Sequence, residues 1–243
     1  MAERHAIVTG ATRGIGWAIA RRLADDGMRV TLLGRDISKL IARASEIGAD
    51  FQAVDLTDGD AVAAAFNEIG PAAILINNAG IAESAPFLKS EDALFQRMFE
   101  VNVLGAVRCT RAVLPMMVKL GWGRVINIAS TAGLQGFSYV SAYAASKHAL
   151  VGITRSLALE VASRGVTVNA ICPGYVATEM TETTIERIVA KTGRTRDEAI
   201  AELAAANPGG RLIQPEEVAA SVAALCGDDA ASITGQAIEV GQA

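Results

Sequence analysis

Short apolar runs alternate with helical patterns along the whole chain of 243 residues. The runs that read as strands each end in small or polar residues, and they begin at His5, Arg29, Asp50, Ala72, Gly123 and Val166. Between them, apolar residues recur at helical spacing, as in the long segment 92–120. Apolar strands separated by helices are typical of a parallel sheet that is covered on both faces. We therefore predict an α/β fold of three layers with a doubly wound parallel sheet.

The chain is long for one ordinary domain but of normal length for one large α/β unit. No linker, low-complexity segment or internal repeat divides it, and 51% of its residues are hydrophobic. We therefore predict a single domain over residues 1–243 with a large core. The carboxyl ends of parallel strands form one rim of such a sheet, and open α/β proteins bind their ligands there.

Composition argues against several classes of function. The formal net charge of −4 and the lack of a long basic run argue against a nucleic-acid partner. The three cysteines, Cys109, Cys172 and Cys226, match neither a disulfide framework nor a zinc spacing, so we expect free thiols. With His5 and His148 as the two histidines, we expect no metal site and no Ser-His-Asp triad. No targeting segment or apolar run of membrane-spanning length is evident, so we expect a soluble cytoplasmic protein.

A glycine-rich stretch, TGATRGIG (9–16), joins the first predicted strand to the first helix. Gly10, Gly14 and Gly16 are spaced G-x-x-x-G-x-G, which differs from the common G-x-G-x-x-G dinucleotide pattern. Glycines still permit a close approach to a pyrophosphate at a helix N-terminus, where free N–H groups favour anions. The alternative is a glycine turn needed only for packing. Its place in a β-α-β pattern favours dinucleotide binding on a Rossmann-type sheet.

The second predicted strand ends in VTLLGRD, which offers both an arginine and an acid. An acid at this point holds the adenosine ribose of NAD, whereas an arginine suits the 2′-phosphate of NADP. Arg35 comes first, after the small Gly34, and Arg13 in the glycine loop adds a second cation. We therefore predict that NADP(H) is favoured over NAD(H), which Asp36 would support instead. The alternative is that Arg35 and Asp36 are two surface residues of a turn.

A tyrosine and a lysine four residues apart in SAYAASKHAL (141–150) share one face of a predicted helix. A free tyrosine has a pKa of about 10, which is too high for efficient proton exchange at neutral pH. Because an ammonium stabilises a phenolate, we expect Lys147 to lower the pKa of Tyr143. A surface lysine beside a half-buried tyrosine is the alternative. Ser130 ends the apolar run RVINIAS, and its hydroxyl can hydrogen-bond a substrate oxygen at the ligand rim.

Together these motifs resemble the short-chain dehydrogenase/reductase family, in its compact single-domain branch. The resemblance covers nearly the whole chain and rests on TGATRGIG, NNAG (77–80), VNVLG with Asn102, INIAS with Ser130, YAASK with Tyr143 and Lys147, and PGYVAT (173–178). The overall look is closest to 3-oxoacyl thioester reductases, polyketide ketoreductases and hydroxyacyl-CoA dehydrogenases. The chain departs from the family at its C-terminus, where IEVGQA leaves a short tail, and this puts contacts of a longer tail in doubt.

The resemblance implies a catalytic set. Tyr143 would exchange a proton with the substrate oxygen, and Ser130 would hydrogen-bond that oxygen. Lys147 would also bond the nicotinamide ribose, and Asn102 would hold a water that relays protons to it. Thr9 would brace the glycine loop rather than touch the ligand.

Matched positions imply a cofactor site. The predicted cofactor-binding residues are Gly10, Thr12, Arg13, Gly14, Ile15, Gly16, Arg35, Asp55, Leu56, Asn78, Ala79, Gly80, Tyr143, Lys147, Pro173, Gly174, Val176 and Thr178. Asp55 ends the predicted strand FQAVD (51–55) and would meet the adenine edge. Asn77 and Ala79 would flank the crevice on the adenosine side. Val176, through its backbone, and Thr178 would hold the nicotinamide carboxamide.

The segment from about 178 to 213 should cover the substrate as a lid, because it follows the predicted nicotinamide contacts. It contains apolar positions at helical spacing and a basic cluster, namely Ile185, Ile188, Val189, Lys191, Arg194 and Arg196. Such a lid suits an acyl chain on a phosphate-bearing carrier, either coenzyme A or acyl carrier protein, although solvated basic residues are the alternative. Glu83 would repel a free carboxylate, which favours a thioester over a keto acid.

We therefore predict an NAD(P)-dependent oxidoreductase that interconverts a ketone and a secondary alcohol, with a 3-oxoacyl/3-hydroxyacyl thioester as substrate. A cyclic or aromatic ketone is the alternative substrate. A non-catalytic nucleotide-binding subunit would be expected to lack the catalytic residues, and a sugar-nucleotide epimerase or dehydratase needs a larger substrate region. Segments 103–117 and 149–162 carry more apolar surface than one core-facing stripe needs. A homo-oligomer is therefore expected, and the resemblance implies a tetramer.

Overall fold

A seven-stranded parallel sheet forms the centre of the computed structural model, which describes residues 4–241. Its strand order is β3-β2-β1-β4-β5-β6-β7. The strands are β1 (His5–Thr9), β2 (Arg29–Gly34), β3 (Asp50–Ala53), β4 (Ile74–Asn77), β5 (Gly123–Ile128), β6 (Val166–Cys172) and β7 (Ala237–Glu239). The chain starts near the middle, builds outward to β3, and returns to build the other half from β4. The predicted doubly wound sheet is confirmed.

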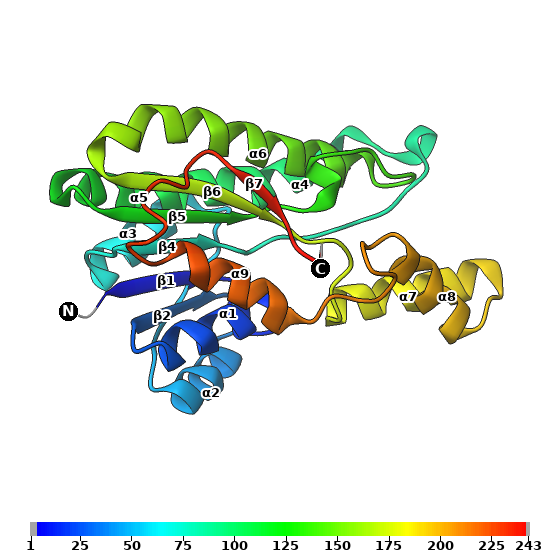
Figure 1. The fold of residues 1–243 in the computed structure, drawn as a ribbon. Helices are drawn as coiled ribbons and strands as arrows, with labels where there is room; N and C mark the ends of the chain where they lie inside the picture. The colour runs from blue at the N-terminus through cyan, green and yellow to red at the C-terminus, as the bar shows by residue number, and fades with distance from the viewer. Residues whose placement is uncertain (1–3, 242–243) are drawn as a thin grey trace.

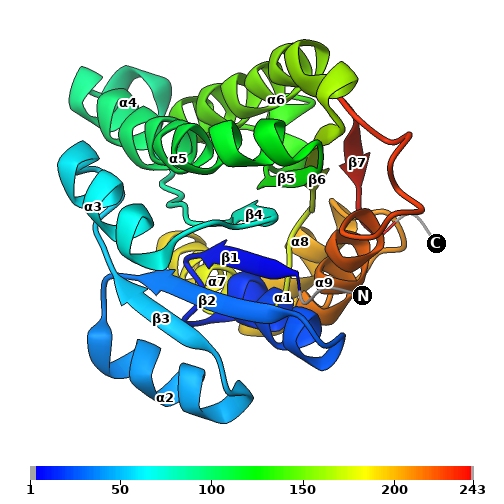
Figure 2. The ribbon, with the colours of Figure 1, turned by 90° about the vertical axis from the view of Figure 1, so that its left-hand side faces the viewer.

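Helices cover both faces of this sheet (Figures 1 and 2). One face carries α1 (Gly14–Asp25), α2 (Ile37–Ile47) and α9 (Pro215–Leu225), and the other carries α3 (Gly59–Ile69), α4 (Asp92–Phe99), α5 (Gly105–Leu120) and α6 (Ser141–Val161). Alternate side chains of a strand point to opposite faces. Val8 therefore packs in the core beneath α1, whereas its neighbour Ile7 packs in the core beneath α5. The three predicted layers are present.

The helical stretch Asp92–Leu120 is long and apolar enough to cross a membrane by length and composition. This corrects the expectation that no run has that length. Val113 and Met117 of the stretch are buried against the sheet, so it is a core helix. A π-helical turn at Glu100–Leu104 separates α4 from α5.

The three cysteines are buried and unpaired, as their spacing predicts. Burial raises the pKa of Cys109 and of Cys226 to about 12, and that of Cys172 to about 11. These thiols therefore remain protonated in the core at neutral pH.

After β6 the chain leaves the sheet as a pair of helices, α7 (Glu179–Thr192) and α8 (Arg196–Ala205), which extends away from the other layers (Figure 1). The pair has a small core of its own, in which Ile185 of α7 packs with Leu203 of α8. Thr195 starts α8 with a capping box, because its side chain and that of Glu198 satisfy each other's backbone N–H groups.

The two ends of this excursion are tied together. A parallel bridge joins Val176 to Ile213, and Ala177 N–H donates to the Ile213 carbonyl at 2.8 Å. Asn207 strengthens the junction by accepting from Tyr175 N–H and donating to the Tyr175 carbonyl, both at 2.8 Å. The bridge and these hydrogen bonds therefore hold the two ends of the helix pair together beside the carboxyl end of β6.

Candidate active site

A cavity of about 600 Å³ opens at the rim formed by the carboxyl ends of β1 to β6. Every residue predicted to bind the cofactor lies on its wall, and so does Ser130. Asn102 and Asn77 do not line it. The structure thus brings the predicted site together in one place, while cofactor binding itself stays a prediction.

The glycine loop forms one wall of the cavity by running very close to its neighbours. Gly10 has a φ of +64°, which favours glycine, and a Cβ on it would lie 2.9 Å from Ala79 Cα. A Cβ on Gly16 would lie 2.3 Å from the Gly10 carbonyl oxygen and 2.4 Å from Asn78 Nδ2. Only glycine fits at these positions, so the loop presents bare backbone at the start of α1. Such a cradle fits the pyrophosphate of a dinucleotide.

Thr9 and Asn78 hold this loop in place. The Thr9 hydroxyl accepts hydrogen bonds from the backbone N–H groups of Asn78, at 2.9 Å, and Ala79, at 3.0 Å. The Asn78 amide donates in turn to the carbonyls of Thr9, at 2.9 Å, and Gly10, at 3.1 Å. The prediction that Thr9 braces the loop is confirmed.

The expectation for Asn77 is wrong. Its side chain is buried and donates to Thr110 Oγ1 at 3.0 Å and to Asn127 Oδ1 at 2.9 Å, inside the layer between the sheet and α5. Because side chains alternate along a strand, Asn77 at the end of β4 points into this layer, and the following residue, Asn78, reaches the cavity wall.

Arg35 and Asp36 have separate tasks. Asp36 starts α2 by accepting from Lys39 N–H at 3.1 Å, and it also accepts from the Ser38 hydroxyl at 2.6 Å. Arg35 lies on the cavity wall, and among residues 4–241 it forms no ion pair. The cavity wall beyond β2 therefore carries the positive charge of Arg35, while Asp36 caps the N-terminus of α2. This arrangement fits a 2′-phosphate.

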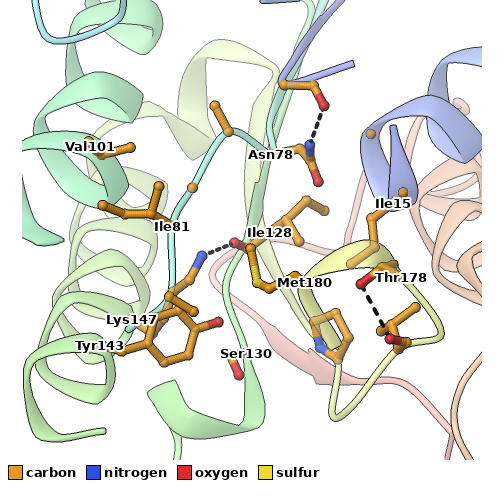
Figure 3. A pocket seen from close by; sticks show the side chains of 18 of the residues that line it. Ile15, Asn78, Ile81, Val101, Ile128, Ser130, Tyr143, Lys147, Thr178 and Met180 are labelled. Carbon is orange, nitrogen blue, oxygen red and sulfur yellow. Dashed lines mark hydrogen bonds between the residues drawn. The ribbon is translucent and has the colours of Figure 1, made fainter. Parts of the chain in front are cut away.

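Two side chains project from α6 into the cavity: the Tyr143 hydroxyl points toward Ser130, which follows β5, and Lys147 points toward the Ile128 carbonyl (Figure 3). Lys147 is buried, its Nζ donates to the Ile128 carbonyl at 2.7 Å, and it lies 5.7 Å from the centre of the Tyr143 ring. Loss of solvation lowers the pKa of Lys147 to about 8.

The predicted effect of Lys147 on its neighbour is wrong for the protein alone. Burial raises the pKa of Tyr143, and hydrogen bonding with Ser130 lowers it by less. Loss of solvation therefore sets the direction of this pKa shift, and the smaller lowering comes from Ser130 rather than from the ammonium that we expected to supply it. A tyrosine that keeps its proton at neutral pH is suited to donating it to a substrate oxygen.

Asn102 lies on the π-helical turn, directly behind the cavity wall. Its amide accepts from Ile81 N–H at 2.8 Å, and donates to the Ile81 carbonyl and to Ser146 Oγ, both at 3.0 Å. A Cβ on Gly80 would lie 3.1 Å from Asn102 Oδ1 and 3.7 Å from Lys147 Nζ. Asn102 and Lys147 are thus separated by bare backbone at Gly80. The water relay between them stays a prediction.

The end of the cavity at which we expect the substrate (the substrate end) is largely apolar. Most of the residues that line it were not predicted from the sequence. Its wall includes Ile81, Val101, Phe137, Val140, Tyr175, Met180, Thr184 and Arg187. Residues 180, 184 and 187 follow the i, i+4, i+7 spacing of one helix face, and that signal could have identified them. The apolar lid residues Ile185, Ile188 and Val189 pack on the small core with α8 instead, so their assignment to the substrate is wrong.

The basic cluster of the lid also lies away from the cavity. Arg194 pairs with Glu202, and Arg196 pairs with Glu182 at 2.6 Å. Lys191 is exposed, and none of the three basic residues lines the cavity wall. Their predicted contact with a carrier therefore has no support in the structure, because acidic neighbours on the same two helices neutralise both arginines.

Glu83 does line the cavity, but its carboxylate forms an ion pair with Arg97. The expectation that Glu83 would repel a free carboxylate loses its basis, because the pair carries no net charge. The charge of the substrate end must therefore come from other groups.

Comparison with known proteins agrees with this geometry. The family model for short chain dehydrogenase matches residues 4–188. A D-beta-hydroxybutyrate dehydrogenase of Rhizobium meliloti is 38% identical, over 96% of this chain and 95% of that protein. A 3-oxoacyl-[acyl-carrier-protein] reductase of Vibrio cholerae is 36% identical, over 97% of this chain and 94% of that protein.

Among solved structures, a variant of the actinorhodin polyketide ketoreductase with NADPH superimposes with a TM-score of 0.93. It is 39% identical, and the match covers 98% of this chain and 95% of that chain. Sequence and fold thus agree over nearly the full length. The chain belongs to the short-chain dehydrogenase family and is an NAD(P)-dependent ketoreductase, an oxidoreductase that acts on CH–OH groups.

Proposed function

We propose that this enzyme is an NADPH-dependent reductase of 3-oxoacyl thioesters. The observation that carries the proposal is that Ser130, Tyr143 and Lys147 converge on a cavity whose substrate end is apolar. An apolar wall suits an acyl chain next to the reacting ketone. Relatives that are named for 3-oxoacyl and polyketide ketone reduction support the substrate class.

The cofactor would lie along the glycine loop, with its 2′-phosphate at Arg35 and its nicotinamide near Thr178. It supplies the hydride when bound. Ala79, Gly80 and Val176 also line the cavity and would contact the cofactor there. The preference for NADPH rests on the unpaired Arg35 and on the use of Asp36 as a helix cap.

In the proposed reaction, Tyr143 donates its proton to the carbonyl oxygen of the substrate. The Ser130 hydroxyl donates a hydrogen bond to the same oxygen and stabilises the charge that develops there. Lys147 lies one helical turn from Tyr143, and its ammonium opposes the cost of leaving a buried phenolate. Asn102 acts as a positioning residue, because its side chain joins Ile81 of the cavity wall to the buried Ser146 of α6.

The thioester carrier is proposed from the relatives, since the basic lid cluster does not face the cavity. The test measures kcat/KM for acetoacetyl-CoA, for acetoacetate and for a cyclic or aromatic ketone, each with NADPH and with NADH. The proposal expects the highest value for the thioester with NADPH. A higher value for the cyclic or aromatic ketone would replace the substrate class, and a higher value with NADH would replace the cofactor.

We further propose that the enzyme acts in the cytoplasm as a homotetramer. Leu104, at the end of the π-helical turn that leads into α5, is 41% exposed; Leu120 on α5 is 65% exposed, and Leu159 on α6 is 85% exposed. Apolar side chains on two neighbouring helices of one face suit contact with another copy of the chain.

A further inference from the structure

Four arginines line the cavity, and two of them are neutralised. Arg13 pairs with Glu179, and Arg97 pairs with Glu83. Among residues 4–241, the other two, Arg35 and Arg187, form no ion pair with any carboxylate. Arg35 belongs to the cofactor end, so the charge of Arg187 needs a separate explanation.

Arg187 is half-buried on the face of α7 that also carries Met180 and Thr184. One of its guanidinium nitrogens, Nη1, donates to the hydroxyl of Ser84 at 2.9 Å. A hydroxyl orients the guanidinium but leaves its positive charge uncompensated. The guanidinium has further N–H donors, in a planar fork that matches a carboxylate or a phosphate.

The position of Arg187 places this charge beyond the reacting group. Thr178 immediately precedes α7, next to the proposed nicotinamide site, and Arg187 follows two and a half turns later. At 1.5 Å per residue, Met180 and Arg187 are separated by roughly 10 Å of helix. A substrate whose ketone lies at Tyr143 would therefore meet Arg187 with its distal part.

We propose that Arg187 is a specificity-determining residue that binds an oxyanion group of the substrate, distal to the ketone. The inference rests on the proposed ketone reduction and deepens it. The oxyanion is either a carboxylate of the substrate itself or a phosphate of its carrier. The neutral Glu83–Arg97 pair leaves Arg187 as the source of net charge at this end of the cavity.

The test uses two matched pairs of ketones with NADPH. 7-Oxooctanoate and its methyl ester differ by the charge of a carboxylate at the far end of the chain from the ketone, and acetoacetyl-CoA and its N-acetylcysteamine thioester differ by the charged part of the carrier. The variant is Arg187→Gln, with Arg187→Lys as a rescue that keeps the charge. Arg196→Gln is the control, because it removes a lid arginine that lies outside the cavity.

In Arg187→Gln, kcat/KM for the anionic member of one pair should fall roughly 10- to 100-fold relative to its neutral member, the usual worth of a hydrogen bond to a charged group. A fall confined to the 7-oxooctanoate pair identifies a carboxylate, and one confined to the coenzyme A pair identifies a phosphate. Arg187→Lys should recover part of the ratio, and Arg196→Gln should leave both ratios unchanged.

Two results would overturn the proposal. An unchanged ratio of kcat/KM between the anionic and the neutral ketone in both pairs would show that Arg187 does not recognise a charged group of the substrate. An equal fall for all four ketones would show that the bond to Ser84 only holds α7 in place, and Ser84→Ala would then reproduce the fall. Failure of the parent enzyme to oxidise NADPH with any ketone is a different outcome, because it removes the proposed function itself.

Discussion

Arg13 and Glu179 join the glycine loop to the first turn of α7 through an ion pair of 2.5 Å. Both side chains lie on the cavity wall, and they are 63% and 67% exposed. An exposed pair of this kind contributes only about 0–1 kcal/mol. Its larger effect is on Arg13, whose charge is taken up by Glu179 and is less available to an anion in the cavity.

Glu179→Gln should therefore tighten NADPH binding, up to about fivefold at low ionic strength. The change frees Arg13 and removes a negative charge near the cofactor site. Fluorescence titration of NADPH measures the Kd, and the effect should shrink as salt is added. Glu182→Gln is the matched control, since Glu182 pairs with Arg196 outside the cavity. Weaker binding in Glu179→Gln would contradict this account.

Arg35→Asp should move the cofactor preference from NADPH toward NADH. The change removes a cation from the 2′-phosphate and adds repulsion, so kcat/KM with NADPH should fall roughly 10- to 100-fold. Asp36→Asn keeps an acceptor for the start of α2, and the ratio of the two cofactors should stay as in the parent enzyme. If the Asp36 variant shifts the ratio and the Arg35 variant does not, the assignment of the two residues is reversed.

Tyr143→Phe should leave folding and NADPH binding nearly intact and lower kcat by about 10²–10⁴-fold. The ring still packs on α6, and only the proton donor is lost. Single-turnover kinetics with NADPH and the best ketone measure the chemical step. Turnover within a few-fold of the parent enzyme would rule out this role.

The buried ammonium of Lys147 predicts a pH dependence of stability. Its pKa is about 8 in the folded protein and about 10.5 in the unfolded chain, taken as the ordinary lysine value. Between these values the unfolded chain binds more protons, so the free energy of unfolding gains a contribution as pH rises. Below about 8 both states are charged, and the cost of burying the charge is fully present.

Comparison with Lys147→Met isolates this contribution, because the variant lacks the titrating group. Urea unfolding at several pH values should show the parent protein gaining stability relative to the variant as pH rises from 8 toward 10.5. A constant difference across that window would mean that the folded-state pKa of Lys147 is not lowered.

The exposed apolar side chains of α5 and α6 predict an oligomer in solution. Light scattering at micromolar concentration should give the mass of a tetramer of the 25.2 kDa chain. A monomeric mass would contradict the proposed assembly and would leave Leu159 as an isolated exposed residue.

Much of the fold could be predicted from the sequence, because strands buried on both faces are recognisable as apolar runs. β2 spans Arg29–Gly34, as the run RVTLLG predicts. The residue at which β3 ends was harder to predict from the sequence. Asp55 was expected to end that strand, but β3 ends at Ala53, and Asp55 forms a turn by accepting from Thr57 N–H. A local side-chain bond of this kind competes with the strand and leaves no apolar signal.

The residues proposed as catalytic could be predicted from the sequence, because they lie in short motifs. The net charge of the substrate end and of the neighbouring helix pair could not be predicted, because it depends on ion pairs between residues that are distant in sequence. Arg97 neutralises Glu83 from fourteen positions away, and Glu182 neutralises Arg196 across two helices. The pKa of Tyr143 was also missed, because loss of solvation depends on the packed surroundings rather than on the neighbouring lysine.

The bridge between Val176 and Ile213 holds the two ends of the α7–α8 segment together, so this segment can be exchanged as one unit. The helix pair leaves and rejoins the body of the enzyme at one point, and Ile185 and Leu203 give it a core of its own. Such a segment can be replaced or lengthened without shifting the register of the sheet. Evolution and protein engineering can therefore alter this side of the cavity while the residues of α6 that we propose for proton transfer stay unchanged.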